Sequence, residues 1–231
     1  MHLSLDPESV KGFLAPEEGK RLYELALEAA SLGPCLEVGS YCGKSTVYIG
    51  SACRERQQLL YAIDHHRGSE EHQPGEEYHD PELLDNNSGK MDSFRTFRNT
   101  LVRADIENAV VPIVASSELA GSQWQTPLAL VFIDGGHSLE AALIDYTTWA
   151  PHVCSGGILA IHDIFPDPAH GGQAPYEIYC RALASGLFEA LHSTLTLGVL
   201  RRLTVERTPV KTPVKTPVKT PVKTSLKLSA D

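Results

Sequence analysis

Apolar positions along the chain fall into short runs that alternate with longer amphipathic segments. Five short apolar runs predict buried strands, at residues 35–38, 59–63, 110–115, 128–133 and 157–161. Apolar residues at helical spacing predict helices at 16–32, 44–54, 92–103, 138–150 and 175–186. Two further runs, 188–193 and 195–203, predict a closing hairpin. This alternation indicates an α/β fold whose mostly parallel sheet is covered by helices on both faces.

Two segments interrupt the alternation. No periodic apolar pattern follows Asp64 until about Gly89. A connection of that length in a compact domain is usually a binding loop or a cover over a site, so we expect a lid-like loop at 65–90. Residues 208–223 are four copies of Thr-Pro-Val-Lys, whose repeated proline excludes helix and central strand. We therefore expect one domain at 1–206, with an N-terminal helical arm at 1–33, and a disordered tail at 207–231.

The charge of the chain is distributed unevenly. The whole sequence has 20 Lys and Arg, 29 Asp and Glu, and a net charge of −9. Without the six basic residues and one acidic residue of the tail, 14 basic and 28 acidic residues remain, a net charge of −14. Nucleic-acid binding requires clustered positive charge, so we expect no nucleic-acid partner.

Several sequence features bear on location and assembly. No apolar run approaches the roughly 20 residues that span a bilayer, so we expect no membrane span. The N-terminus lacks the pattern of a secretory signal, and five cysteines without Cys-x-x-Cys spacing are typical of free thiols. These features predict a cytoplasmic protein. They leave both a monomer and a homo-oligomer open.

Polar residues directly follow each of the five predicted parallel strands. They are Glu37 and Gly39, Asp64, Ser116 and Ser117, Asp134 to His137, and His162 and Asp163. Ligands of open parallel sheets bind beyond the carboxyl ends of the strands. The five strand ends together predict one ligand site at that edge.

The first strand leads into a glycine turn, Glu-Val-Gly-Ser-Tyr-Cys-Gly-Lys-Ser at 37–45. Its two glycines permit close approach of a ligand to the backbone, and the next helix points free N–H groups at the same place. The turn is one residue short of a P-loop, and the Glu37 carboxylate would repel a phosphate. Tyr41 occupies the place of the second glycine of a dinucleotide-binding turn.

The turn resembles the first motif of class I S-adenosylmethionine-dependent methyltransferases, and is most similar to the catechol O-methyltransferase-like branch. The resemblance continues at 132–137, at Asp145-Tyr146 and at 156–163. Together these motifs resemble the small bacterial group called methyltransferase family 24, over about residues 30–203. The resemblance implies a Rossmann-like three-layer sandwich with a mostly parallel seven-stranded sheet and a C-terminal antiparallel hairpin. It also implies S-adenosylmethionine as cofactor.

The same resemblance implies which residues bind the cofactor: Glu37, Gly39, Ser40, Gly43, Asp64, Ser116, Ser117 and Asp134. Glu37 would face the cationic amino-acid end, directly or through water, and the turn and helix N-terminus would face the carboxylate. Asp64 would accept from the ribose hydroxyls, and the two serines would line the adenine. Alternatively, Asp64 is an ordinary turn or capping residue, and the serines have no ligand role.

Asp134, His162 and Asp163 align with the residues that hold Mg²⁺ in catechol-type enzymes, although His-Asp here replaces the usual Asp-Asn pair. The carboxylates suit Mg²⁺ or Mn²⁺, whereas His162 would favour Mn²⁺, Fe²⁺ or Zn²⁺, or would orient a ligand from behind. Without a metal, Asp134 contacts the cofactor and Asp163 caps a helix or binds substrate. His137 aligns with the catalytic lysine and would be a general base, or would cap its helix or pack against Tyr146.

We therefore expect a methyltransferase that methylates a hydroxyl of a small molecule, such as a sugar, a natural product or a phenol, with or without a divalent cation. One alternative is a nicotinamide- or nucleotide-dependent enzyme on a similar sheet. Another is a non-catalytic, cofactor-binding scaffold protein that uses the repeat tail for interaction. The sequence does not name the acceptor.

Overall fold

The computed structural model describes residues 1–204, except 70, 71, 74, 77 and 78. The predicted tail at 207–231 lies outside the described residues, as do five positions of the predicted loop at 65–90.

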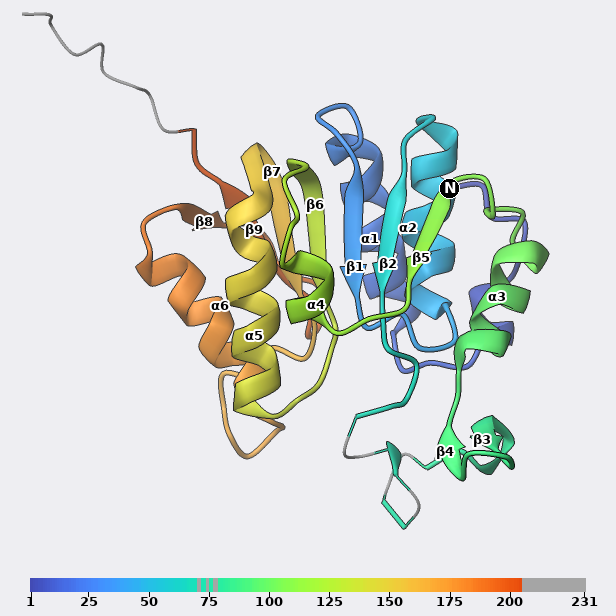
Figure 1. Cartoon of the computed structure of the whole chain (residues 1–231). Coiled ribbons are helices and arrows are strands. Elements are labelled where there is room, and N and C mark those ends of the chain that lie inside the picture. Colours follow the sequence, from blue (N-terminus) through green and yellow to red (C-terminus); the bar gives the residue numbers. More distant parts are fainter. Residues whose placement is uncertain (70–71, 74, 77–78, 205–231) are drawn as a thin grey trace, which may run out of the picture.

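A seven-stranded sheet forms the centre of the molecule, in the order β5-β2-β1-β6-β7-β9-β8 (Figure 1). Five strands run parallel: β1 (Cys35–Val38), β2 (Leu60–Ile63), β5 (Val110–Ile113), β6 (Leu128–Ile133) and β7 (Val153–Ile161). At one edge β9 (Gly198–Arg202) runs antiparallel to both β7 and β8 (Phe188–Ala190). The predicted mostly parallel sheet with a C-terminal antiparallel hairpin is confirmed.

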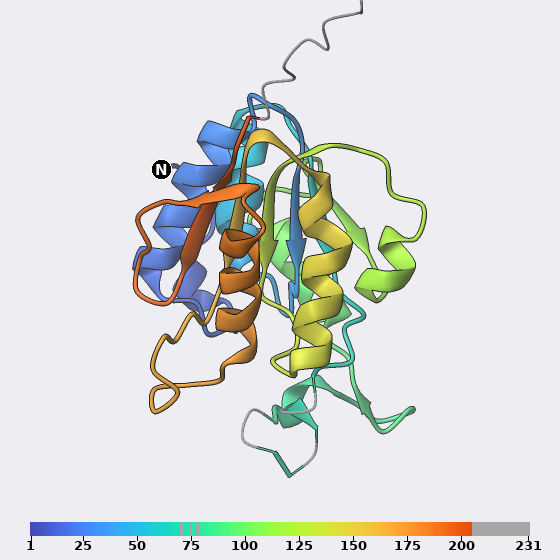
Figure 2. The ribbon, with the colours of Figure 1, turned by 90° about the vertical axis from the view of Figure 1, so that its left-hand side faces the viewer.

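Helices cover both faces of this sheet (Figure 2). One hydrophobic core packs α1 (Pro16–Ala29), α2 (Lys44–Glu55) and α3 (Phe94–Arg103) against one face. A second core packs α5 (Leu139–Trp149), α6 (Ala174–Ala184) and the short α4 (Ser117–Gly121) against the other. β6 is buried along its whole length because it lies between these layers. The predicted three-layer α/β sandwich is confirmed.

Some boundaries differ from the sequence pattern. β7 begins at Val153, before the predicted start at 157, because its glycines conceal the strand pattern and Gly156 adopts a φ of 79°. The pairing of β6 with β7 also shifts register between Leu128 and Leu130. The strand expected at 110–115 ends at Ile113, and the unpredicted α4 follows it. Five residues are too few to display a helical period.

The connection from β2 to α3 contains more secondary structure than its sequence pattern predicts. It contains the 3₁₀ turn η3 (Pro81–Leu83) and a short hairpin of β3 (Leu84–Asp85) and β4 (Lys90–Met91). Leu83 and Met91 are buried in the core of the α1–α3 face. The segment lies beyond the carboxyl end of β2, below the sheet in Figure 1. Two further 3₁₀ turns are η1 (Pro7–Ser9) and η4 (Ala150–His152). Among the described helices, none is long and apolar enough to cross a membrane.

Candidate active site

A cavity of about 560 Å³ opens at the carboxyl ends of the parallel strands. This volume lies within the range of small-molecule sites. The loops after β1, β2, β5 and β6 line it, together with the first turns of α5. The structure brings six of the predicted site residues to the cavity: Gly39, Asp64, Ser116, Ser117, Asp134 and His137.

Three other predicted cofactor residues, Glu37, Ser40 and Gly43, lie behind this surface. Glu37 and Ser40 are buried, and Gly43 is the N-cap of α2 with a φ of 95°, packed towards α3. Among the described residues, neither Glu37 Oε1 nor Ser40 Oγ has a hydrogen-bond partner. Buried polar atoms normally have a hydrogen-bond partner, so these two atoms can accept a hydrogen bond from a bound ligand or a water molecule.

The Glu37 carboxyl is unusual because it belongs to a fully buried strand, one residue before the end of β1. Burial raises its pKa to about 7, and the nearby Asp134 and Asp64 carboxylates act in the same direction. The hydroxyls of Ser45 and Thr46 oppose this shift, and Thr46 Oγ1 donates to Oε2 at 2.6 Å. A cation nearby would therefore stabilise the ionised form of Glu37.

Gly39 allows the turn to pack directly against the end of β6. Its φ is 84°, and a Cβ atom at this position would lie 2.0 Å from the Asp134 carbonyl oxygen. No side chain fits there, so the glycine holds the two loops that form the cavity floor in contact.

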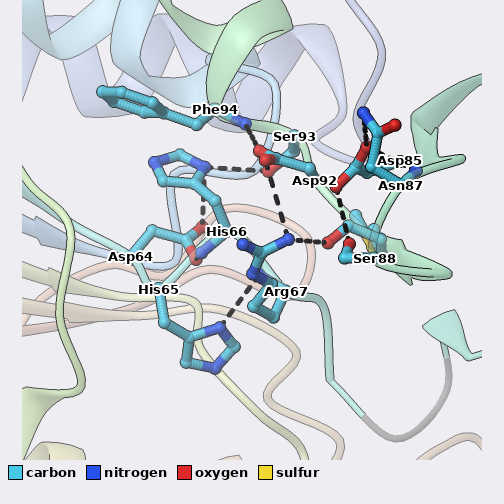
Figure 3. A network of polar contacts seen from close by, with 11 residues as sticks. Asp64, His65, His66, Arg67, Asp85, Asn87, Ser88, Asp92, Ser93 and Phe94 are labelled. Atoms are coloured by element: carbon cyan, nitrogen blue, oxygen red, sulfur yellow. Dashed lines mark hydrogen bonds and ion pairs between the residues drawn. The ribbon is translucent and has the colours of Figure 1, made fainter.

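Asp64 joins the glycine turn to the start of the next loop, where it lies beside His66 (Figure 3). Its Oδ2 accepts from the Tyr41 N–H at 2.8 Å, and its Oδ1 accepts from the His66 N–H at 2.7 Å. These two bonds leave lone pairs on both oxygens towards the cavity that Asp64 lines. Asp64 thus acts as a turn residue and can still accept from a ligand hydroxyl.

The histidines of the loop divide into different roles. His66 is buried, its Nδ1 lies 2.8 Å from Ser93 Oγ, and burial lowers its pKa, so it is a structural residue. His65 and His72 line the cavity, whereas His79 Nδ1 contacts the His72 carbonyl. Arg67 donates to the Met91 carbonyl and lies 3.6 Å from Asp92, which ties the two ends of the loop together (Figure 3).

The hydroxyls of the two cavity serines are engaged within the protein. Ser116 is the N-cap of α4 and accepts from the Leu119 N–H. Ser117 Oγ accepts from the Trp149 indole at 2.9 Å, and the Ser117 hydroxyl acts to lower the pKa of Asp145. Asp145 also lines the cavity, and burial raises its pKa to about 6. Both serine hydroxyls thus already take part in hydrogen bonds within the protein, and the contact of these serines with adenine stays a prediction.

Asp134, His162 and Asp163 form a cluster at the ends of β6 and β7. One ligand atom from each lies within 4.8 Å of the others. His162 Nδ1 is 3.2 Å from Asp134 Oδ1 and 3.4 Å from Asp163 Oδ2. Two carboxylates and one imidazole nitrogen are a suitable donor set for a divalent cation.

Charge compensation holds this cluster together. Burial alone would lower the pKa of His162, but Asp134, Asp163 and Glu18 raise that pKa well above its ordinary value. Burial likewise acts to raise the pKa of Asp163, yet His137 and His162 hold it below its usual range. Asp163 also adopts a left-handed φ of 57°, which is uncommon outside glycine and tolerated best by Asp and Asn.

Glu18 is a site residue that sequence reasoning missed. It lies in the first turn of α1, is 2% exposed, and its Oε2 is 2.9 Å from His162 Nε2. Charged residues near the start of a helix are usually solvated, so its identity alone gave no signal. The position of Glu18 does indicate burial, because Glu18 shares a helical face with the buried Leu22 and Leu25.

His137 lies at the rim of the cavity, and its side chain is 37% exposed. Its Nε2 is 3.3 Å from Asp163 Oδ2. The N-cap of α5 is Ser138, whose Oγ accepts from the Ala141 N–H, so His137 does not serve as the cap. The arrangement places an imidazole beside a carboxylate at the surface of the cavity.

Comparison with known proteins identifies the family. A family model described as a methyltransferase domain matches residues 36–164, more than half of the 231 residues. The chain belongs to this methyltransferase family. The matched region begins in β1 and ends just after Asp163, so it contains the glycine turn, Asp64 and the cluster of Asp134, His162 and Asp163.

Solved structures share the fold at low sequence identity. The O-methyltransferase NovP is 17% identical, with a TM-score of 0.61 over 81% of this chain and 80% of NovP. TomG from Streptomyces achromogenes, an O-methyltransferase in complex with SAM, is 16% identical with a TM-score of 0.56 over 83% and 82%. An rRNA methylase from Streptococcus thermophilus is 13% identical with a TM-score of 0.53 over 84% and 100%. The methyltransferase fold is thus shared by proteins with different acceptors.

Proposed function

We propose that this methyltransferase transfers the methyl group of S-adenosylmethionine to a hydroxyl of a small molecule bound at the rim of the 560 Å³ cavity. The observation that carries the proposal is the pairing of His137 with Asp163 beside Asp134, at the mouth of a cavity whose floor is the glycine turn. The O-methyltransferase neighbours TomG and NovP support the choice of a hydroxyl acceptor.

The cofactor would lie along the loops after β1, β2, β5 and β6. Gly39 and the turn backbone leave room for its amino-acid end, with Glu37 reached through water because it lies behind the surface. Asp64 would accept from the ribose hydroxyls, and the loop at Ser116 and Ser117 would lie against the adenine. Ser40 and Gly43 would support the turn from behind.

His137 would act as general base in the transfer step. The acceptor oxygen attacks the methyl carbon, the carbon–sulfur bond breaks, and the neutral thioether S-adenosylhomocysteine leaves. The hydroxyl proton passes to His137, whose imidazole lines the cavity with its Nε2 3.3 Å from Asp163 Oδ2. Asp163 would orient the ring and stabilise the imidazolium that forms.

Asp134, His162 and Asp163 would hold Mg²⁺ or Mn²⁺, with the imidazole nitrogen favouring Mn²⁺. A bound cation would lower the pKa of the acceptor hydroxyl. The donor set fits such an ion because three ligand atoms already converge without help from the rest of the cavity.

A small-molecule acceptor fits the charge of the domain better than nucleic acid does. Residues 1–206 contain 28 acidic and 14 basic residues, a poor surface for a polyanion. All five cysteines are free, which supports our proposal that the enzyme works in the reducing cytoplasm.

The proposal is tested by measuring S-adenosylhomocysteine release with a panel of phenols, sugars, hydroxylated natural products and an rRNA fragment, with and without Mn²⁺. We expect turnover with at least one small hydroxyl compound, and a kcat about 10²–10⁴-fold lower after His137→Ala. Turnover with rRNA alone, or full activity of the His137→Ala variant, would refute it.

A further inference from the structure

Glu18 is a buried carboxylate that does not line the cavity yet contacts the cluster behind it. Four donors converge on it. Oε1 accepts from the Thr196 N–H at 2.9 Å and the Thr196 hydroxyl at 2.8 Å. Oε2 accepts from the Ala15 N–H at 3.2 Å and faces His162 Nε2 at 2.9 Å. With both oxygens engaged and 2% exposure, this carboxylate has one fixed orientation.

That orientation determines how the His162 ring lies. An ionised carboxylate can only accept hydrogen bonds, so His162 Nε2 must carry the proton of the shared bond. The other ring nitrogen, Nδ1, is then directed at Asp134 and Asp163. His162 is itself 6% exposed, so the ring has little freedom to turn away.

Glu18 also connects parts of the chain that are far apart in sequence. It comes from α1, His162 follows β7, and Thr196 lies in the connection between β8 and β9. The family match begins at residue 36, so Glu18 lies outside the region that the family model describes.

We infer that Glu18 is a positioning residue for the cation site, which fixes His162 through the Nε2–H···Oε2 bond so that Nδ1 is presented to an ion held by Asp134 and Asp163. The inference rests on the proposed metal site. A carboxylate behind a ligating histidine fixes its tautomer and raises its basicity, and loss of such a partner typically weakens metal binding by about 10–100-fold.

The competing explanation is that Glu18 only anchors α1. Two variants separate the explanations. Glu18→Gln keeps the shape but removes the negative charge, so the charge-assisted bond to His162 Nε2–H is weakened or lost whichever way the amide lies. Thr196→Val removes a hydroxyl bond to the same carboxylate without touching His162. The exposed Glu17, Glu18's neighbour on α1, supplies a charge-matched control as Glu17→Gln.

The experiment titrates the full chain with Mn²⁺ alone and detects the unbound ion by electron paramagnetic resonance. The affinity for S-adenosylhomocysteine and the melting temperature are measured on the same variants. We expect Glu18→Gln to weaken Mn²⁺ binding by about 10–100-fold with unchanged S-adenosylhomocysteine affinity. Thr196→Val should lower the melting temperature but leave Mn²⁺ affinity unchanged, and Glu17→Gln should change neither.

An unchanged Mn²⁺ affinity in Glu18→Gln would overturn the inference, as would equal weakening in Thr196→Val. Failure of the wild-type protein to bind Mn²⁺ would also overturn it. In each case the S-adenosylhomocysteine titration shows separately whether the methyltransferase proposal stands, because Glu18 lies away from the cofactor-binding part of the cavity.

In a second readout, ¹⁵N spectra of histidine-labelled protein should show His162 protonated at Nε2 in the wild type. Loss of that signature in Glu18→Gln, with a folded spectrum otherwise, supports positioning. A wild-type spectrum with Nε2 unprotonated would overturn it.

Discussion

We expect the buried Glu37 carboxylate to lower the free energy of unfolding at neutral pH and, at the same time, to strengthen cofactor binding. The variant Glu37→Gln tests both effects. In the cofactor-free protein, burial raises the pKa of Glu37 from 4.5 to about 7. Because the folded state holds this proton more tightly than the unfolded state, the associated stability is present below pH 4.5 and is lost as pH rises through about 7. At about 1.36 kcal/mol per pKa unit, the loss is roughly 3 kcal/mol.

Glutamine imitates the protonated side chain, so its variant should not show this loss. We expect similar free energies of unfolding for both proteins near pH 5, and an advantage of up to about 3 kcal/mol for Glu37→Gln at pH 8. Urea unfolding at both pH values measures the difference. Cofactor binding should change in the opposite direction, since a charge-assisted hydrogen bond worth about 1.5–3 kcal/mol corresponds to a ten- to hundredfold loss of S-adenosylhomocysteine affinity.

A stability difference between the two proteins that stays constant from pH 5 to pH 8 would refute the electrostatic reasoning. Unchanged S-adenosylhomocysteine affinity in Glu37→Gln would refute the proposed contact with the cofactor's amino group, even if the pH dependence were as expected.

Three further changes test the site. His137→Ala should lower kcat by about 10²–10⁴-fold with unchanged S-adenosylhomocysteine affinity, whereas His170→Ala, on an exposed loop, should leave kcat unaltered; equal losses would argue against a base. Asp163→Asn should change the melting temperature little, because Asn also tolerates the left-handed backbone, but it should lower Mn²⁺ affinity at least about tenfold. Wild-type Mn²⁺ affinity in this variant would exclude Asp163 as a ligand. Gly39→Ala should lower the free energy of unfolding by about 3 kcal/mol or more and abolish cofactor binding. The control Gly186→Ala has a similar φ of 68° but no atom within 4 Å of the added Cβ, so it should cost about 1 kcal/mol. Similar costs for the two variants would contradict the close packing of the turn.

The parallel sheet and its helices could be predicted from sequence because apolar runs such as 128–133 are buried on both faces and leave an unbroken pattern. The same logic placed Asp64 and Asp134 together, since parallel strands end at one edge. The prediction did not distinguish residues on the cavity surface from residues behind it. Glu37 and Gly39 are two positions apart, yet one is buried and the other lines the cavity.

The remaining features depend on contacts between distant segments. Glu18 meets His162 across 144 positions of sequence, and no local pattern encodes that pair. α4 is too short to show periodicity, and the structured part of the loop depends on Leu83 and Met91 reaching the core. Sequence patterns report local periods, whereas these features arise from tertiary packing.

The central claim is that the cavity binds S-adenosylmethionine. Calorimetric titration of the protein with S-adenosylhomocysteine and, separately, with NAD⁺ tests it most directly. We expect one S-adenosylhomocysteine bound per chain, no NAD⁺ binding, and loss of the S-adenosylhomocysteine signal in Gly39→Ala. Binding of NAD⁺ without binding of S-adenosylhomocysteine would contradict it.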